Sequence, residues 1–83
     1  MRVLYFAWLR EKTGTSAEEI TLPAGITTAA QLIGWLAARG PGYAAAFANP
    51  AVLRCAIGQE FCPLDTPLAG AAEVAFFPPV TGG

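Results

Sequence analysis

Residues 2–9 read RVLYFAWL, a run of β-branched and aromatic side chains that is typical of a β-strand. Alternate side chains of a strand point to opposite faces, so Val3 and Tyr5 share one face while Leu4 and Phe6 share the other. Both sets are apolar. Such a strand lies in the interior of its sheet, or one of its faces is reserved for a partner. The stretch therefore predicts a central strand at the start of the chain.

The residues that follow alternate between turns and further strands. The polar stretch 10–16 contains Gly14 and predicts a turn. Ser16 and Glu19 also have the spacing of a helix capping box, but Pro23 and Gly25 follow too soon for that helix to grow, so a strand is preferred there. Further strands are predicted over residues 17–22, 51–57, 60–62 and 73–77.

One main helix is predicted over residues 28–39, with a short second helix over 43–48. Thr28 and Gln31 have the spacing of a capping box. An apolar stripe with helical periodicity follows, formed by Ala29, Leu32, Ile33 and Leu36. Gly40 predicts a left-handed helix stop and Pro41 prevents continuation. Gly34 suggests close approach of this helix to the sheet.

This order of elements predicts an α+β fold with the helix on one face of a mixed sheet. A β-grasp roll satisfies the order, because its first and last strands are adjacent and parallel in the middle of the sheet. It also explains the doubly apolar first strand. We expect a single unit, with a β-grasp domain over 1–77 and an extended tail over 78–83.

Composition excludes several classes of function. The 83 residues contain no His, and their net charge is −1. A His-containing catalytic triad or zinc site is therefore impossible within the chain, and nucleic acid is not expected as a partner. No metal site, membrane span or export signal is expected, which favours a cytoplasmic protein. The chain is not expected to be catalytic by itself.

The last residues of the sequence suggest where chemistry could take place. Residues 74–83 carry no charged side chain, and Pro78 and Pro79 favour a stiff, extended exit from the sheet. Gly82 and Gly83 lack Cβ atoms, so they could thread a narrow channel in another protein. One interpretation is an ordinary frayed terminus. The other is a carboxyl group that is delivered to a partner's active site.

The ending EVAFFPPVTGG and the opening VLYFAWLREKTGT resemble those of the small, sulfur-carrying subunits of molybdopterin synthase. Ala56, Ile57 and Gln59, and the Pro67-Leu68 loop, follow that family in order and spacing. The chain departs from the family at Gly58 and at the Ala71-Ala72 pair. The resemblance extends over effectively the whole chain.

The resemblance implies a ubiquitin-like β-grasp fold and a defined chemistry at Gly83. An ATP-dependent activating enzyme would adenylate Gly83, which would then be converted to a thiocarboxylate. No cofactor would be bound by this chain. The tail would insert into a large synthase subunit, in a heterotetramer of two small and two large subunits. Sulfur would pass to cyclic pyranopterin monophosphate and build the dithiolene of molybdopterin.

The tail is also expected to contact these partners. Phe76 and Phe77 should point to opposite faces, one in the core and the other on a partner surface, although both could be buried. Phe6 and Trp8 are expected in the core or covering the sheet, with a partner surface as the alternative, and Trp35 is expected to be partly exposed. The partner-binding residues predicted in this way are Phe76, Phe77, Pro78, Pro79, Val80 and Thr81, with Gly82 threading the channel.

Two cysteines form a further pair of interest. If Gly58-Gln59 is a two-residue hairpin turn, Cys55 lies directly opposite Cys62. The thiols would then be within possible bonding range, or simply packed in reduced form. Arg10, Glu11 and Lys12 are expected to form a solvated loop, with partner docking as the alternative.

Two other functions use a similar ending. A ubiquitin-like modifier would form isopeptide bonds with lysines of other proteins, and a sulfur carrier could serve another pathway such as that of thiamine. A plain β-grasp interaction module would not need its last two glycines.

Overall fold

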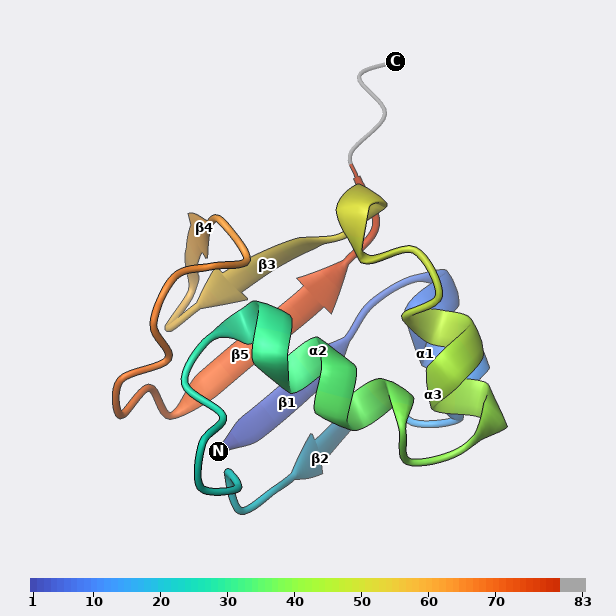
Figure 1. The fold of residues 1–83 in the computed structure, drawn as a ribbon. Coiled ribbons are helices and arrows are strands. Elements are labelled where there is room, and N and C mark those ends of the chain that lie inside the picture. The colour runs from blue at the N-terminus through green and yellow to red at the C-terminus, as the bar shows by residue number, and fades with distance from the viewer. Residues whose placement is uncertain (80–83) are drawn as a thin grey trace.

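The computed structural model describes residues 1–79, which form one five-stranded sheet with helices on one side and at one end (Figure 1). Its elements, in chain order, are β1 (Arg2–Tyr5), α1 (Trp8–Thr13), β2 (Ala17–Glu19), α2 (Ala29–Ala37), α3 (Pro41–Ala46), the 3-10 helix η1 (Pro50–Val52), β3 (Arg54–Ile57), β4 (Glu60–Cys62) and β5 (Glu73–Phe77).

The strand order is β2-β1-β5-β3-β4, and β1 runs parallel to β5 while the other neighbours are antiparallel. The first and last strands are thus adjacent and parallel inside the sheet. The predicted α+β class and β-grasp topology are confirmed.

Helix α2 lies across one face of the sheet and supplies most of the helical side of the core (Figure 1). Its predicted stripe is buried, with Leu32, Ile33 and Leu36 packed in the same cluster as the inward side chains of β1 and β5. The predicted capping box is also present, because Thr28 accepts from the backbone of Gln31 and the Gln31 side chain accepts from the backbone of Thr28. The local sequence therefore determines where this helix begins.

The prediction of a strand over residues 2–9 is wrong beyond Tyr5. Ala7 has φ 54° and ψ −133°, which turns the chain out of β1 and into helix α1. That helix ends at Gly14, whose left-handed conformation (φ 82°) allows its N–H to bond to the carbonyl of Arg10. The polar stretch REKT therefore forms a helix, as the high helix propensities of Arg, Glu and Lys allow, and not a turn. Phe6 and Trp8 are exposed, so of the positions predicted for them the core is wrong.

Other boundaries shift for local reasons. Strand β2 stops at Glu19 because the last ladder bond, from Ile20 N–H, reaches Met1, where the partner strand begins. Gly40 is extended (φ 162°) and not left-handed, and Ala38 caps α2. Pro41 begins α3, as its fixed φ suits a first helical position. Pro50 likewise starts η1, so the strand predicted over 51–57 begins only at Arg54.

Two glycines in the helical region have opposite surroundings. A Cβ on Gly42 of α3 would overlap the carbonyl oxygen of Lys12, which shows how closely α3 approaches α1. A Cβ on Gly34 of α2 would meet no atom. The predicted close approach of Gly34 to the sheet is therefore wrong, and it is Gly42 that permits close packing.

Within residues 1–79, no helix combines the length and the apolar character that a membrane crossing requires.

Candidate functional site: the open sheet face and the C-terminal exit

The face of the sheet opposite α2 carries an apolar surface. We call it the open-face patch and define it as Leu4, Phe6, Ala56, Phe61, Ala75 and Phe77. Strand register places Leu4 beside Ala75, Ala75 beside Ala56, and Ala56 beside Phe61. The patch therefore runs as one row across β1, β5, β3 and β4.

The shape of the patch follows from the sizes of its side chains. Ala56 and Ala75 form a low floor, while Phe61 and Phe77 stand at one side with ring centroids 5.3 Å apart. Phe61 is 81% exposed and Phe6 is 48% exposed. These three phenylalanines line an open groove of about 690 Å³. Large, exposed aromatics beside an apolar trough are typical of a protein-binding surface.

The end of β5 continues along this groove. Phe76 is fully buried in the core, whereas Phe77 is half-buried on the open face. The predicted alternation of these two residues is confirmed, and it removes Phe76 from the surface that a partner could contact. Pro78 and Pro79 line the groove beyond Phe77. Val80, Thr81, Gly82 and Gly83, the other predicted site residues, lie outside the described residues.

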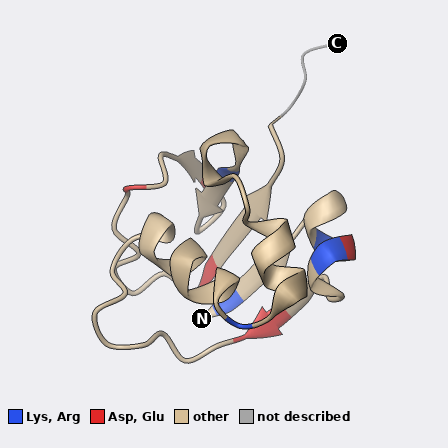
Figure 2. Ribbon diagram, turned by 45° about the vertical axis from the view of Figure 1, so that its right-hand side comes forward, with Lys and Arg blue, Asp and Glu red and all other residues tan. Residues whose placement is uncertain are grey.

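Charged residues gather on α1, where Arg10, Glu11 and Lys12 are exposed, and on β2 (Figure 2). Two others lie on the strands of the site itself: Arg54 of β3 pairs with Phe77, and Glu73 of β5 lines the groove. Residues 74–79 carry no charged side chain. The groove therefore offers a partner mainly apolar contact, with Gln59 and Glu73 as its polar lining residues.

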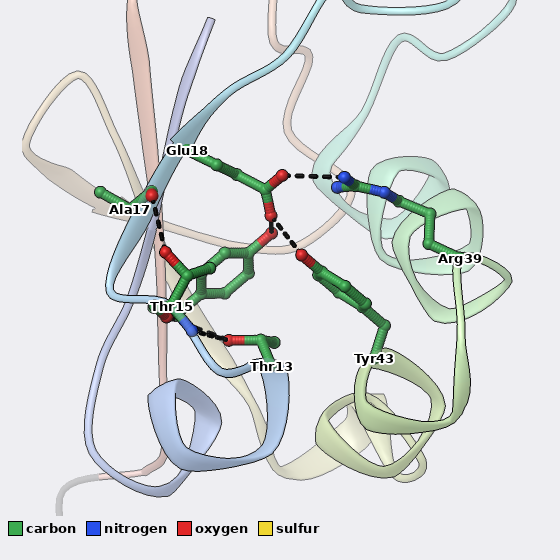
Figure 3. Close-up of polar contacts among 7 residues, drawn as sticks. Thr13, Thr15, Ala17, Glu18, Arg39 and Tyr43 are labelled. Atoms are coloured by element: carbon green, nitrogen blue, oxygen red, sulfur yellow. Dashed lines mark hydrogen bonds and ion pairs between the residues drawn. The ribbon is translucent and has the colours of Figure 1, made fainter.

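The most connected polar cluster lies elsewhere, around Glu18 (Figure 3). The Tyr5 and Tyr43 hydroxyls donate to Glu18 Oε2 at 2.8 and 2.7 Å, and Arg39 Nη2 lies 2.9 Å from Oε1. The Arg39 guanidinium also lies over the rings of Trp35 and Tyr43. Both carboxylate oxygens are thus engaged, and the cluster ties β1, β2, α3 and the end of α2 together.

The electrostatics of this cluster fit a structural role. Burial raises the pKa of Glu18, but hydrogen bonds from Arg39, Tyr43 and Tyr5 outweigh it and hold that pKa below the ordinary value. Burial and the Glu18 carboxylate raise the pKa of Tyr5 and of Tyr43. Glu18 therefore stays ionised and both phenols stay protonated at neutral pH. This arrangement braces the fold, and none of its groups is poised to exchange a proton near pH 7.

Comparison with known proteins identifies the family. The ThiS family model matches residues 3–83. The chain belongs to the ThiS family.

Two relatives of this ThiS-family chain bear the name molybdopterin synthase sulfur carrier subunit. The Escherichia coli protein is 41% identical over 83 residues, which cover 100% of this chain and 99% of the relative. The Haemophilus influenzae protein is 40% identical with the same coverage. These similarities confirm the predicted family and the role of a sulfur carrier in molybdenum cofactor biosynthesis.

A solved structure shows the same fold in a more distant protein. The crystal structure of SAMP1 from Haloferax volcanii superimposes with a TM-score of 0.70, at 24% identity, over 100% of this chain and 98% of that one. The ubiquitin-like β-grasp architecture of this ThiS-family chain is thereby confirmed.

Sequence reasoning missed the most exposed residue of the patch. The sequence predicts Phe61 in a short edge strand but does not assign it to a partner surface. Its neighbour Cys62 packs against the core cluster, so alternation along β4 directs Phe61 to the other face. The hairpin register shows that Phe61 shares a face with Ala56 and that Cys55 and Cys62 share the other, but it does not show which of the two faces α2 covers.

Proposed function

We propose that this chain is the small subunit of a molybdopterin synthase and that it delivers sulfur on the α-carboxyl group of Gly83. The observation that carries the proposal is identity of about 40% over the full chain to two proteins named as the sulfur carrier subunit of that enzyme. The ending Pro78-Pro79-Val80-Thr81-Gly82-Gly83 supplies the groups that such a role requires.

The proposed chemistry proceeds in two stages. The Gly83 carboxylate attacks the α-phosphate of ATP in an activating enzyme, and pyrophosphate leaves to give an acyl-adenylate. A sulfur nucleophile then displaces AMP and leaves a thiocarboxylate. In the large subunit the thiocarboxylate sulfur bonds to a carbon of cyclic pyranopterin monophosphate. Water then cleaves the acyl–sulfur bond, so that the Gly83 carboxylate is regenerated and the sulfur stays on the pterin, and two such transfers build the dithiolene. Gly82 and Gly83 suit this role because no Cβ obstructs their passage through a narrow channel.

The remaining groups of the site would come from partners. We propose that the large subunit, in an assembly of two small and two large subunits, supplies the acid, base and phosphate-binding residues. ATP is held by the activating enzyme, and this chain binds no cofactor of its own. A cytoplasmic location fits the supply of ATP and of these partners.

The open-face patch is the proposed docking surface for these partners. Phe77, Pro78 and Pro79 continue from the patch toward the end of the chain, so a protein that covers the groove also lies next to the exit. Binding of a partner to the open-face patch would therefore bring Pro78 and Pro79 next to that partner. Residues Val80 and Thr81 would extend the contact toward the partner's active site.

The decisive experiment is an intact-mass measurement of the chain after incubation with ATP, the activating enzyme and inorganic sulfide. We expect the mass to rise by the difference between one sulfur and one oxygen atom. The variant that lacks Gly83 should show no gain in mass, and it should retain its stability within about 0.5 kcal/mol because the deleted residue has no side chain to bury.

Two results would contradict the proposal. An unchanged mass with an active enzyme and ATP would show that the carboxyl group is not activated. Covalent attachment to lysines of other proteins, without a thiocarboxylate, would show that the chain is a protein modifier instead. A chain extended by one residue after Gly83 is the matched control, since its carboxyl carbon moves by about 3.5 Å and should no longer be adenylated.

A further inference from the structure

The Cys55 and Cys62 thiols form a second chemical feature of the molecule. The hairpin turn at Gly58 and Gln59 places Cys55 directly opposite Cys62 on β3 and β4, as predicted from the sequence. The two Sγ atoms are 3.8 Å apart, and both cysteines are free. Directly opposed residues of antiparallel strands have Cα atoms about 4.5–5.5 Å apart, which lies within the range that a disulfide spans.

The two thiols differ in their surroundings. Cys55 is 1% exposed, and its thiol points to the Cys62 carbonyl oxygen at 3.3 Å. Burial, with a smaller effect of Cys62, raises the pKa of the Cys55 thiol to about 12. Cys62 is only half-buried and belongs to the edge strand. A reagent can therefore approach Cys62 more readily than Cys55.

A groove gives access to the pair. It has a volume of about 870 Å³, and both cysteines line it together with Arg54, Asp65 and Phe61. This groove lies on the edge-strand side of the fold, where β4 has no further neighbour within the described residues. A small disulfide reagent can thus reach Cys62 through this groove without unfolding of the core.

We propose that Cys55 and Cys62 are a dithiol–disulfide site, in which Cys62 reacts first with a low-molecular-weight disulfide and Cys55 then closes the intramolecular bond. In the first step the Cys62 thiolate attacks one sulfur of the reagent and releases one reagent thiol, which leaves a mixed disulfide. In the second step the Cys55 sulfur attacks Cys62 Sγ, its proton is lost and the second reagent thiol leaves. The two protein thiols are oxidised, and one reagent disulfide is reduced to two thiols.

Closing the bond requires the sulfur atoms to move from 3.8 Å to about 2.05 Å. The bond would tie the edge strand β4 to β3 by a covalent link. Phe61 precedes Cys62, so the disulfide would also restrict the residue that forms one wall of the open-face patch. The site is therefore a modification site next to an exposed aromatic surface.

The test is to incubate the folded, reduced chain with oxidised glutathione and to measure its intact mass over time. We expect a transient glutathione adduct, followed by a stable product lighter than the reduced chain by two hydrogen atoms. Peptide mapping should link Cys55 to Cys62 within one chain, and a thiol reductant should restore the original mass. No loss of two hydrogen atoms, or a disulfide between two chains, would overturn the proposal.

Two variants test the order of the steps. In Cys55→Ala the glutathione adduct on Cys62 should persist, because no second thiol is available to displace it. In Cys62→Ala the buried Cys55 should form an adduct at least tenfold more slowly than Cys62 does in Cys55→Ala, since its thiolate is scarce and shielded. Equal rates in the two variants would overturn the assignment of Cys62 as the first nucleophile. The wild-type measurement remains decisive if either variant does not fold.

Discussion

The two faces of the sheet are built from the same strands but differ in what covers them. On the face below α2, Val3, Tyr5, Val74 and Phe76 are essentially unexposed. On the opposite face, neighbouring residues of the same strands form the open-face patch, with Phe61 81% exposed. Both faces are apolar, so hydrophobic alternation alone does not distinguish core from binding surface. The difference depends on which face the single main helix covers.

The largest effect is expected from Phe76, on the covered face. Replacing Phe76 by Ala leaves a cavity against Phe47, whose ring lies 5.4 Å away, and should lower the free energy of unfolding by about 3–5 kcal/mol. Urea denaturation followed by circular dichroism measures this loss. In so small a domain, Phe76→Ala could remove most of the folded population.

Phe76→Leu is the matched variant for the case in which Phe76→Ala does not fold. It keeps most of the buried volume and should therefore lose clearly less stability than Phe76→Ala. If Phe76→Ala lost no more stability than Phe61→Ala, the covered face would contribute no more to the stability of the fold than the open face does.

The second effect concerns the helices that close one end of the covered face. Gly42→Ala should destabilise the protein by about 1–3 kcal/mol, because its Cβ would overlap the Lys12 carbonyl and push α3 away from α1. Thermal unfolding measures the change. Gly34→Ala is the control: its methyl group meets nothing, so a helix interior should gain up to about 1 kcal/mol. Equal changes in melting temperature in Gly42→Ala and Gly34→Ala would contradict the close packing of α3 against α1.

The third effect is a pH dependence at the Glu18 cluster, which joins the sheet to α3. A carboxyl group whose pKa is lower in the folded than in the unfolded state adds stability above its unfolded value, and that stability is lost as pH falls through the folded value. The unfolding free energy should therefore drop as pH falls below the ordinary value of 4.5. Glu18→Gln should lower the free energy of unfolding by about 1 kcal/mol at pH 7.

The control for this prediction is the pH profile of Glu18→Gln itself, because other carboxyl groups also titrate. The difference in unfolding free energy between wild type and Glu18→Gln should become steadily smaller as the pH is lowered below 4.5. A difference that stays constant with pH would show that Glu18 stabilises the fold by packing and not by charge.

Much of this architecture could be predicted because it depends on local signals. The capping box at Thr28 and Gln31 and the Gly58-Gln59 turn each fixed an element, and the turn also fixed the register of Cys55 and Cys62. Helix α1 was missed because it depends on the unusual backbone of Ala7, a non-glycine residue at positive φ, which no residue pattern announces. The exposed position of Phe61 was missed because it depends on which face α2 covers, a tertiary property.

The smallest effect on stability, and the sharpest test of the open face, is expected at Phe61. Phe61→Ser should change the free energy of unfolding by no more than about 0.5 kcal/mol, because the side chain is already in solvent. If the open-face patch binds the large synthase subunit, the same substitution should weaken that complex at least about tenfold, as expected when an aromatic anchor is removed. Isothermal titration calorimetry measures the affinity.

Trp8→Ala is the matched control for Phe61→Ser. Trp8 is an exposed aromatic that does not line the groove, so its replacement should leave the affinity unchanged. Equal weakening by both variants would mean that exposed aromatics act without regard to position, and an unchanged affinity in Phe61→Ser would place the partner on another surface.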